Sequence, residues 1–145
     1  MYEFIEYRVR DAMTHHPVTI TRETLLSEVE TLFAELDFNC LPVTEGGLLV
    51  GIVTKLDVLK AFAFTSNTML PHYEDIIRQP AESVMTHRPI TVTPDVSLTR
   101  VLQQMVETRY HSFPVARDAL LIGMISRQDI LRALARAVEG ERPQG

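Results

Sequence analysis

The length and composition of the chain are those of an ordinary globular protein. Its 145 residues are 46% hydrophobic and 23% charged, which suffices for one domain or two small lobes without disulfides. The net charge of −5 and the pI of about 5.5 argue against a general nucleic-acid binder, which needs a basic surface. No apolar run approaches the roughly 18 residues that span a membrane. The N-terminal stretch carries acidic residues where a signal peptide would carry basic ones. The single cysteine, Cys40, fits a reducing compartment. We therefore expect a cytoplasmic protein.

In chain order, the first half predicts a small α/β lobe with the order strand, helix, strand, strand, helix. A short helical turn precedes it, and the amphipathic helix is indicated by apolar residues at helical spacing. The expected elements are Val18–Ile20, Thr24–Asp37, Cys40–Thr44, Leu48–Val53 and a helix after Thr54.

The second half of the chain repeats the first at an offset of 72 residues. "MTHHPVTIT" from Met13 returns as "MTHRPITVT" from Met85, and "LLVGIVTKLDVLKAF" from Leu48 returns as "LLIGMISRQDILRAL" from Leu120. The second set of expected elements is Ile90–Val92, Val96–Arg109, Ser112–Ala116, Leu120–Ile125 and a helix after Ser126. We therefore predict two related lobes at residues 7–64 and 81–138. A linker at 65–80 with a short helix around Tyr73–Arg78 would join them, and a disordered tail at 139–145 would follow.

The point where a strand becomes a helix carries Thr54-x-x-Asp57 in one copy and Ser126-x-x-Asp129 in the other. One interpretation is a capping box, in which the hydroxyl and the acid satisfy free backbone N–H groups. The other is a ligand site, because a helix N-terminus favours phosphate and a carboxylate can accept hydrogen bonds from two vicinal hydroxyls. The acid is Asp both times, whereas a capping box usually has Glu or Gln, which favours the ligand site.

The ordered set Met-Thr…Pro, apolar-Pro-Val and Gly-apolar-apolar-Thr/Ser-x-x-Asp, present twice, resembles a tandem pair of CBS domains, often called a Bateman module. The resemblance covers about Val9 to Val138. It implies an α/β (α+β) fold of two pseudo-symmetric lobes packed through their small sheets. It also implies a free-standing regulatory module, not an enzyme, that binds AMP, ADP, ATP or S-adenosylmethionine as a regulatory ligand and has no cofactor. The alternative is a constitutive dimeric scaffold whose clefts are empty.

By the same resemblance, each of two clefts between the lobes draws residues from both copies. The cleft of Asp129 would combine Ser126, Gln128 and His111 with Thr14, Thr19 and Asn39. The cleft of Asp57 would combine Thr54, Leu56 and Asn39 with Thr86, Thr91 and His111.

Lys55 and Arg127, which follow the hydroxyls, are expected to reach a phosphate. Gln128 can donate a hydrogen bond where Leu56 cannot, and Arg127 presents a planar fork. We therefore expect the Asp129 cleft to be the better phosphate site, by about one to two orders of magnitude in Kd.

Metal binding and catalysis find little support in the sequence. His15, His16 and His87 lie beside prolines, without a cluster of zinc-ligand spacing. Cys40 and His111 could be read as a nucleophile and its base, but Cys40 lies in a predicted strand where a small buried hydrophobe is expected. We expect neither a metal site nor a catalytic site.

The helices Val58–Phe64 and Ile130–Val138 are apolar on more than one face. One face would cover the helix's own sheet, so the other needs a partner. We expect a homodimer with Phe62 and Leu134 at its interface. An unknown effector protein is the other partner considered, and neither nucleic acid nor a membrane is expected.

Overall fold

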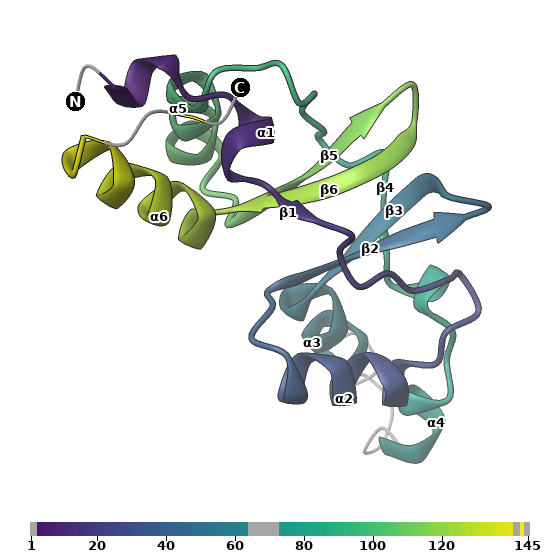
Figure 1. Cartoon of the computed structure of the whole chain (residues 1–145). Helices are drawn as coiled ribbons and strands as arrows, with labels where there is room; N and C mark the ends of the chain where they lie inside the picture. Colours follow the sequence, from purple (N-terminus) through teal and green to yellow (C-terminus); the bar gives the residue numbers. More distant parts are fainter. Residues whose placement is uncertain (1–2, 64–72, 141–142, 144–145) are drawn as a thin grey trace. The chain divides into compact units, whose positions relative to one another are not determined.

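The computed structural model describes residues 3–63, 73–140 and 143 (Figure 1). The chain divides into two units, Met1–Pro17 with Ile90–Gly145, and Val18–Pro89. We call them the Asp129 unit and the Asp57 unit. Their boundaries differ from those of the sequence copies, because the leading segment of each copy belongs to the unit that holds the other copy's Asp.

The Asp129 unit contains helices and one antiparallel three-stranded sheet. Its elements are η1 (Glu3–Glu6), α1 (Val9–Ala12), β1 (Thr14–His15), α5 (Leu98–Thr108), β5 (Ser112–Arg117), β6 (Leu120–Ser126) and α6 (Arg127–Val138). Strand β6 pairs with β5 along its length and with the two residues of β1 on its other side. Helices α5 and α6 contact each other beside the β5–β6 hairpin (Figure 1). Their buried faces meet the hairpin in one core that includes Leu98, Val101, Phe113, Ile125 and Ile130.

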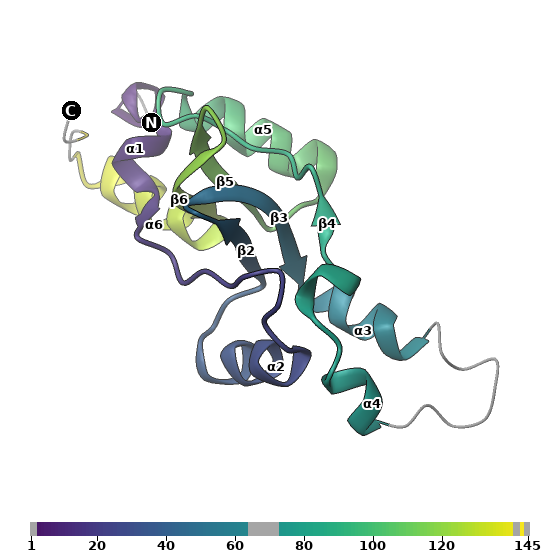
Figure 2. The ribbon, with the colours of Figure 1, turned by 90° about the vertical axis from the view of Figure 1, so that its right-hand side faces the viewer.

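The Asp57 unit repeats this arrangement. Its elements are α2 (Leu26–Glu35), β2 (Cys40–Glu45), β3 (Leu48–Thr54), α3 (Lys55–Ala63), α4 (Tyr73–Ile77), η2 (Ala81–Ser83) and β4 (Thr86–His87). Strand β3 pairs antiparallel with β2 and with β4. Helix α4 contacts both α2 and α3 (Figure 2). The core of this unit includes Leu26, Val29, Leu41, Val53 and Ile76.

Most elements expected from the sequence are present, with helix ends one or two residues shorter. The two predicted leading strands are reduced to single parallel bridges, Ile20 to Val43 and Val92 to Val115. The strands β1 and β4 were not expected. The Met-Thr-His segment of each copy pairs with the central strand of one unit, and the residues after it touch a strand of the other unit at one point only.

The helix expected around Tyr73–Arg78 is confirmed as α4, whose Ile76 is buried in the core of the Asp57 unit. Residues 64–72 of the expected linker, and residues 141–142 and 144–145 of the expected tail, lie outside the described residues. Among the helices of the described part of the chain, none has the length and apolar character needed to cross a membrane.

Candidate functional site

Each unit carries a cluster of polar side chains where its central strand ends and a helix begins. The Asp129 cluster consists of Thr14, Ser126 and Asp129, and the Asp57 cluster consists of Thr86, Thr54 and Asp57. The two clusters have equivalent positions in the two sequence copies, so each difference between them can be assigned to particular side chains.

Both clusters contain a complete capping box. In the Asp129 cluster, the N–H of Asp129 donates to Ser126 Oγ at 3.2 Å, and the N–H of Ser126 donates to Asp129 Oδ2 at 2.9 Å. In the Asp57 cluster the corresponding distances are 3.1 and 2.9 Å. The capping interpretation of the Thr/Ser-x-x-Asp motif is therefore confirmed. It is compatible with the ligand interpretation, because the box uses only one acceptor position of each carboxylate.

The threonine of the Met-Thr-His segment adds a second hydroxyl to each carboxylate. Thr14 Oγ1 donates to Asp129 at 3.3 Å from Oδ1 and 3.5 Å from Oδ2. Thr86 Oγ1 donates to Asp57 at 3.3 Å from Oδ2 and 3.5 Å from Oδ1. Strands β1 and β4 bring these threonines to carboxylates that belong to the other sequence copy.

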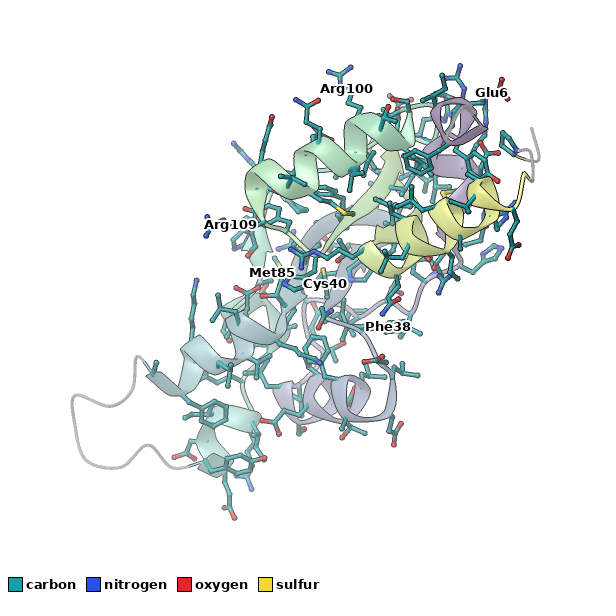
Figure 3. The ribbon with its side chains drawn as sticks, turned by 90° about the vertical axis from the view of Figure 1, so that its left-hand side faces the viewer. Glu6, Phe38, Cys40, Met85, Arg100 and Arg109 are labelled. Carbon is teal, nitrogen blue, oxygen red and sulfur yellow. The ribbon has the colours of Figure 1, made fainter. Side chains whose placement is uncertain are left out.

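A glycine in each central strand permits this approach. A Cβ atom on Gly123 would lie 2.5 Å from the carbonyl oxygen of Thr14. One on Gly51 would lie 2.8 Å from that of Thr86 and 2.9 Å from the sulfur of Met85, a side chain labelled in Figure 3. The repeated motif therefore has glycine at this position because the backbone of the Met-Thr-His segment lies too close for a side chain.

Both carboxylates are buried, with 2% exposure for Asp129 and 8% for Asp57, whereas the flanking side chains are exposed. Buried charge requires hydrogen-bond donors or a counter-charge. The clusters therefore place a hydrogen-bonded carboxylate just beneath exposed positions at the helix N-terminus. These positions are Arg127 and Gln128 in one unit, and Lys55 and Leu56 in the other.

The two clusters differ in how many donors reach the carboxylate. Asp129 also accepts from Ser126 Oγ at 3.0 Å and from the guanidinium of Arg132, with which it forms an ion pair. The equivalent of Arg132 is Lys60, for which no ion pair with Asp57 is found in the part of the chain that the structure describes. Sequence reasoning missed Arg132. The signal was its spacing, because residues three apart on a helix are neighbours.

The cations expected to reach a phosphate have other contacts. Arg127 Nη2 donates to the carbonyl of Arg109 at 3.2 Å. Arg109 directly follows α5 and is labelled in Figure 3. Lys55 Nζ lies 6.0 Å from the ring centroid of Phe33. The backbone N–H groups of Arg127 and Lys55 donate to the carbonyls of His111 and Asn39 at 2.9 and 3.3 Å. Among the described residues, no acceptor is found for the N–H groups of Gln128 and Leu56, which come next along each helix.

The remaining predicted site residues are divided between the units. Thr91 and His111 belong to the Asp129 unit, Thr19 and Asn39 belong to the Asp57 unit, and all four side chains are exposed. Their expected places in sites that draw on both copies stay predictions.

The chain is similar to known proteins in both sequence and fold. The sequence model of the CBS domain matches residues 9–64 and 81–136. Uncharacterized protein MJ0188 of Methanocaldococcus jannaschii is 30% identical over 129 residues, which is 87% of this chain but only 43% of that protein.

Among solved structures, a putative acetoin utilization protein (AcuB) from Vibrio cholerae is similar with a TM-score of 0.81. Its identity is 26%, over 94% of this chain and 98% of that one. The CBS domain pair of protein MJ0100, in complex with 5-methylthioadenosine and S-adenosyl-L-methionine, has a TM-score of 0.74 and 25% identity. The match covers 90% of this chain and 98% of that one. The repeated motif, the paired units and these matches show that the chain belongs to the CBS-domain family and contains a tandem CBS pair.

Proposed function

We propose that the chain is a regulatory module that binds an adenine nucleotide or a related adenosyl compound at the Asp129 and Asp57 clusters and performs no chemistry of its own. The observation that carries the proposal is the repeated cluster, in which a buried carboxylate lies beside the N-terminus of a helix. Such a carboxylate can accept from the vicinal hydroxyls of a ribose, and the helix N-terminus favours a phosphate or another anion.

The complex of the MJ0100 CBS pair with two adenosyl compounds supports this class of ligand. Both of those compounds contain a ribose with vicinal hydroxyls, which is the group that Asp57 and Asp129 would recognise. A phosphate is therefore optional, and the choice among AMP, ADP, ATP and S-adenosylmethionine depends on what faces the helix N-terminus.

The test is a thermal-shift panel of these four compounds, followed by calorimetry on the best of them. A ligand at 100 times its Kd stabilises the folded protein by about 2.7 kcal/mol. Asp57→Asn and Asp129→Asn should each remove or weaken one binding event, because an amide oxygen replaces the charged acceptor with a weaker one. Equal binding by wild type and both variants would refute the proposal.

A second candidate function is a constitutive scaffold with empty clefts. The observation that favours it is that both capping boxes are complete without a ligand and both carboxylates are almost inaccessible. In that case the Asn variants would lower the melting temperature, and none of the four compounds would raise it.

We also propose that the chain forms a homodimer through helices α3 and α6. Leu59 and Leu131, equivalent positions in the two copies, are 63% and 59% exposed, and Val138 is 73% exposed. The residues first expected at this interface already have contacts within their units. Phe62 stacks on Tyr73 with ring centroids 5.7 Å apart, and Leu134 packs on the core of the Asp129 unit. An effector protein is the alternative partner for the same faces.

A further inference from the structure

The carboxylates of the two clusters differ in their remaining capacity to accept hydrogen bonds. An ionised carboxylate offers about four acceptor positions on its two oxygens. Asp129 receives four donors, namely the N–H and the hydroxyl of Ser126, the hydroxyl of Thr14 and the guanidinium of Arg132. Its acceptor positions are therefore filled.

Asp57 is filled only in part. Among the described residues it receives the N–H of Thr54 at 2.9 Å and the hydroxyl of Thr86 at 3.3 Å. Two acceptor positions therefore remain on a carboxylate whose surroundings otherwise match those of Asp129. A pair of vicinal hydroxyls can use both of them, and one hydroxyl can use one.

We propose that Arg132 occupies an acceptor position on Asp129 that a hydroxyl of a vicinal diol would use, so that Arg132 weakens diol binding at the Asp129 cluster and leaves the Asp57 cluster unaffected. This inference rests on the proposed function, because it concerns the same ribose-type ligand. Binding at Asp129 then requires the guanidinium to leave, whereas binding at Asp57 requires no such step.

The exposure of the two partners makes the exchange feasible. The side chain of Arg132 is 66% exposed, so the guanidinium can turn into water and stay solvated. The carboxylate is 2% exposed with the guanidinium in place, so water or an incoming diol must replace the lost donor. Arg132 thus acts on the ribose end of the ligand. Gln128 and Arg127, which led us to expect tighter binding at Asp129, act on the phosphate end.

The test is calorimetric titration with AMP, one cluster at a time. In an Asp57→Asn background, Arg132→Ala should lower the Kd at the Asp129 cluster about fivefold, which corresponds to an ion pair of about 1 kcal/mol. In an Asp129→Asn background, Lys60→Arg should raise the Kd at the Asp57 cluster by a similar factor, and Lys60→Ala is the matched control that should leave it within about twofold.

A ligand without the vicinal diol provides the second control. With 2′,3′-dideoxyadenosine monophosphate, Arg132→Ala should change the Kd by less than about twofold, because this ligand has no ribose hydroxyl to place on the carboxylate. An unchanged Kd for AMP in Arg132→Ala overturns the inference. A raised Kd also overturns it, because it would mean that Arg132 binds the ligand directly.

A ligand-free measurement separates this inference from the proposed function. In urea unfolding, Arg132→Ala and Asp129→Asn should be non-additive, whereas Lys60→Ala and Asp57→Asn should be additive. Additivity of the first pair overturns the inference, whatever AMP does. Coupling without heat from AMP, ADP, ATP or S-adenosylmethionine in any variant overturns the proposed function, and with it the competition.

Discussion

Thr14 Oγ1 lies 3.3 Å from Asp129 Oδ1, although the two residues are 115 positions apart in the sequence. Thr86 makes the same contact with Asp57 from the opposite copy. The leading segments of the two copies are therefore exchanged, and each copy completes the polar cluster of the other. The duplication is thus more than two independent lobes in series, because neither cluster can form from one copy alone.

Removal of these hydroxyls should have unequal effects. Asp57 has two donors among the described residues and Asp129 has four, so Thr86→Ala takes away half of the donors and Thr14→Ala a quarter. We expect Thr86→Ala to lower the free energy of unfolding by about 1–1.5 kcal/mol and Thr14→Ala by about 0.5 kcal/mol. Urea unfolding measures both. Thr86→Ser keeps the hydroxyl and is the control, and equal losses for the two Ala variants would contradict the expectation.

Gly123→Ala should be among the most damaging small substitutions in the Asp129 unit. Its Cβ would lie 2.5 Å from the carbonyl oxygen of Thr14, which is backbone and cannot move without separating β1 from β6. Overpacking of this kind costs about 1–3 kcal/mol. Urea unfolding gives the loss, and the intensity of slow-exchanging amides in β1 and β6 shows whether the strands separate.

The matched variant in the other unit is Gly51→Ala, where the nearest atoms are the carbonyl oxygen of Thr86 at 2.8 Å and the sulfur of Met85 at 2.9 Å. A comparable loss is expected there. Stability within about 0.5 kcal/mol of wild type for Gly123→Ala would show that β1 does not pass so closely.

The parts of the site that were predictable from the sequence are those with short spacing. The hydroxyl and the acid three residues apart made a capping box one of two interpretations of the motif, and the repeat predicted that the motif would occur twice. The contacts of Thr14 and Thr86 were expected only through the family resemblance, because nothing in local spacing relates residues so distant.

Strands β1 and β4 and the ion pair of Arg132 were not predicted, for two different reasons. Strands β1 and β4 have two residues each, which is too short for any hydrophobic period to indicate them. Arg132 is not singled out by the sequence pattern, because the apolar faces dominate its helix, although an Arg three residues after an Asp commonly forms an ion pair on a helix surface.

Ala119→Gly should stabilise the chain. The turn between β5 and β6 places Asp118 and Ala119 at φ of 50° and 68°, and the equivalent turn has Gly46 and Gly47 at 59° and 84°. A side chain at positive φ is strained, and glycine relieves the strain at some cost in unfolded-state entropy. We expect a gain of about 0.5–1 kcal/mol in urea unfolding. The reverse change, Gly47→Ala, should lose a similar amount, and a loss for Ala119→Gly would contradict the expectation.

The dimer proposal predicts that charge on α3 or α6 separates the protomers. Leu59 and Leu131 are exposed in their units, so Leu59→Asp and Leu131→Asp should leave the fold intact while opposing burial of these helices against a second chain. Sedimentation at micromolar concentration should give about twice the 16.5 kDa monomer mass for wild type and the monomer mass for each variant.

Val106→Asp is the matched control, because Val106 on α5 is 71% exposed and lies outside both helices. Leu is preferable to Phe62 for this test, since Phe62→Asp would also break the stacking on Tyr73 and confuse unfolding with dissociation. A monomeric wild type would refute the dimer, and a dimer that persists in both Leu variants would place its interface elsewhere.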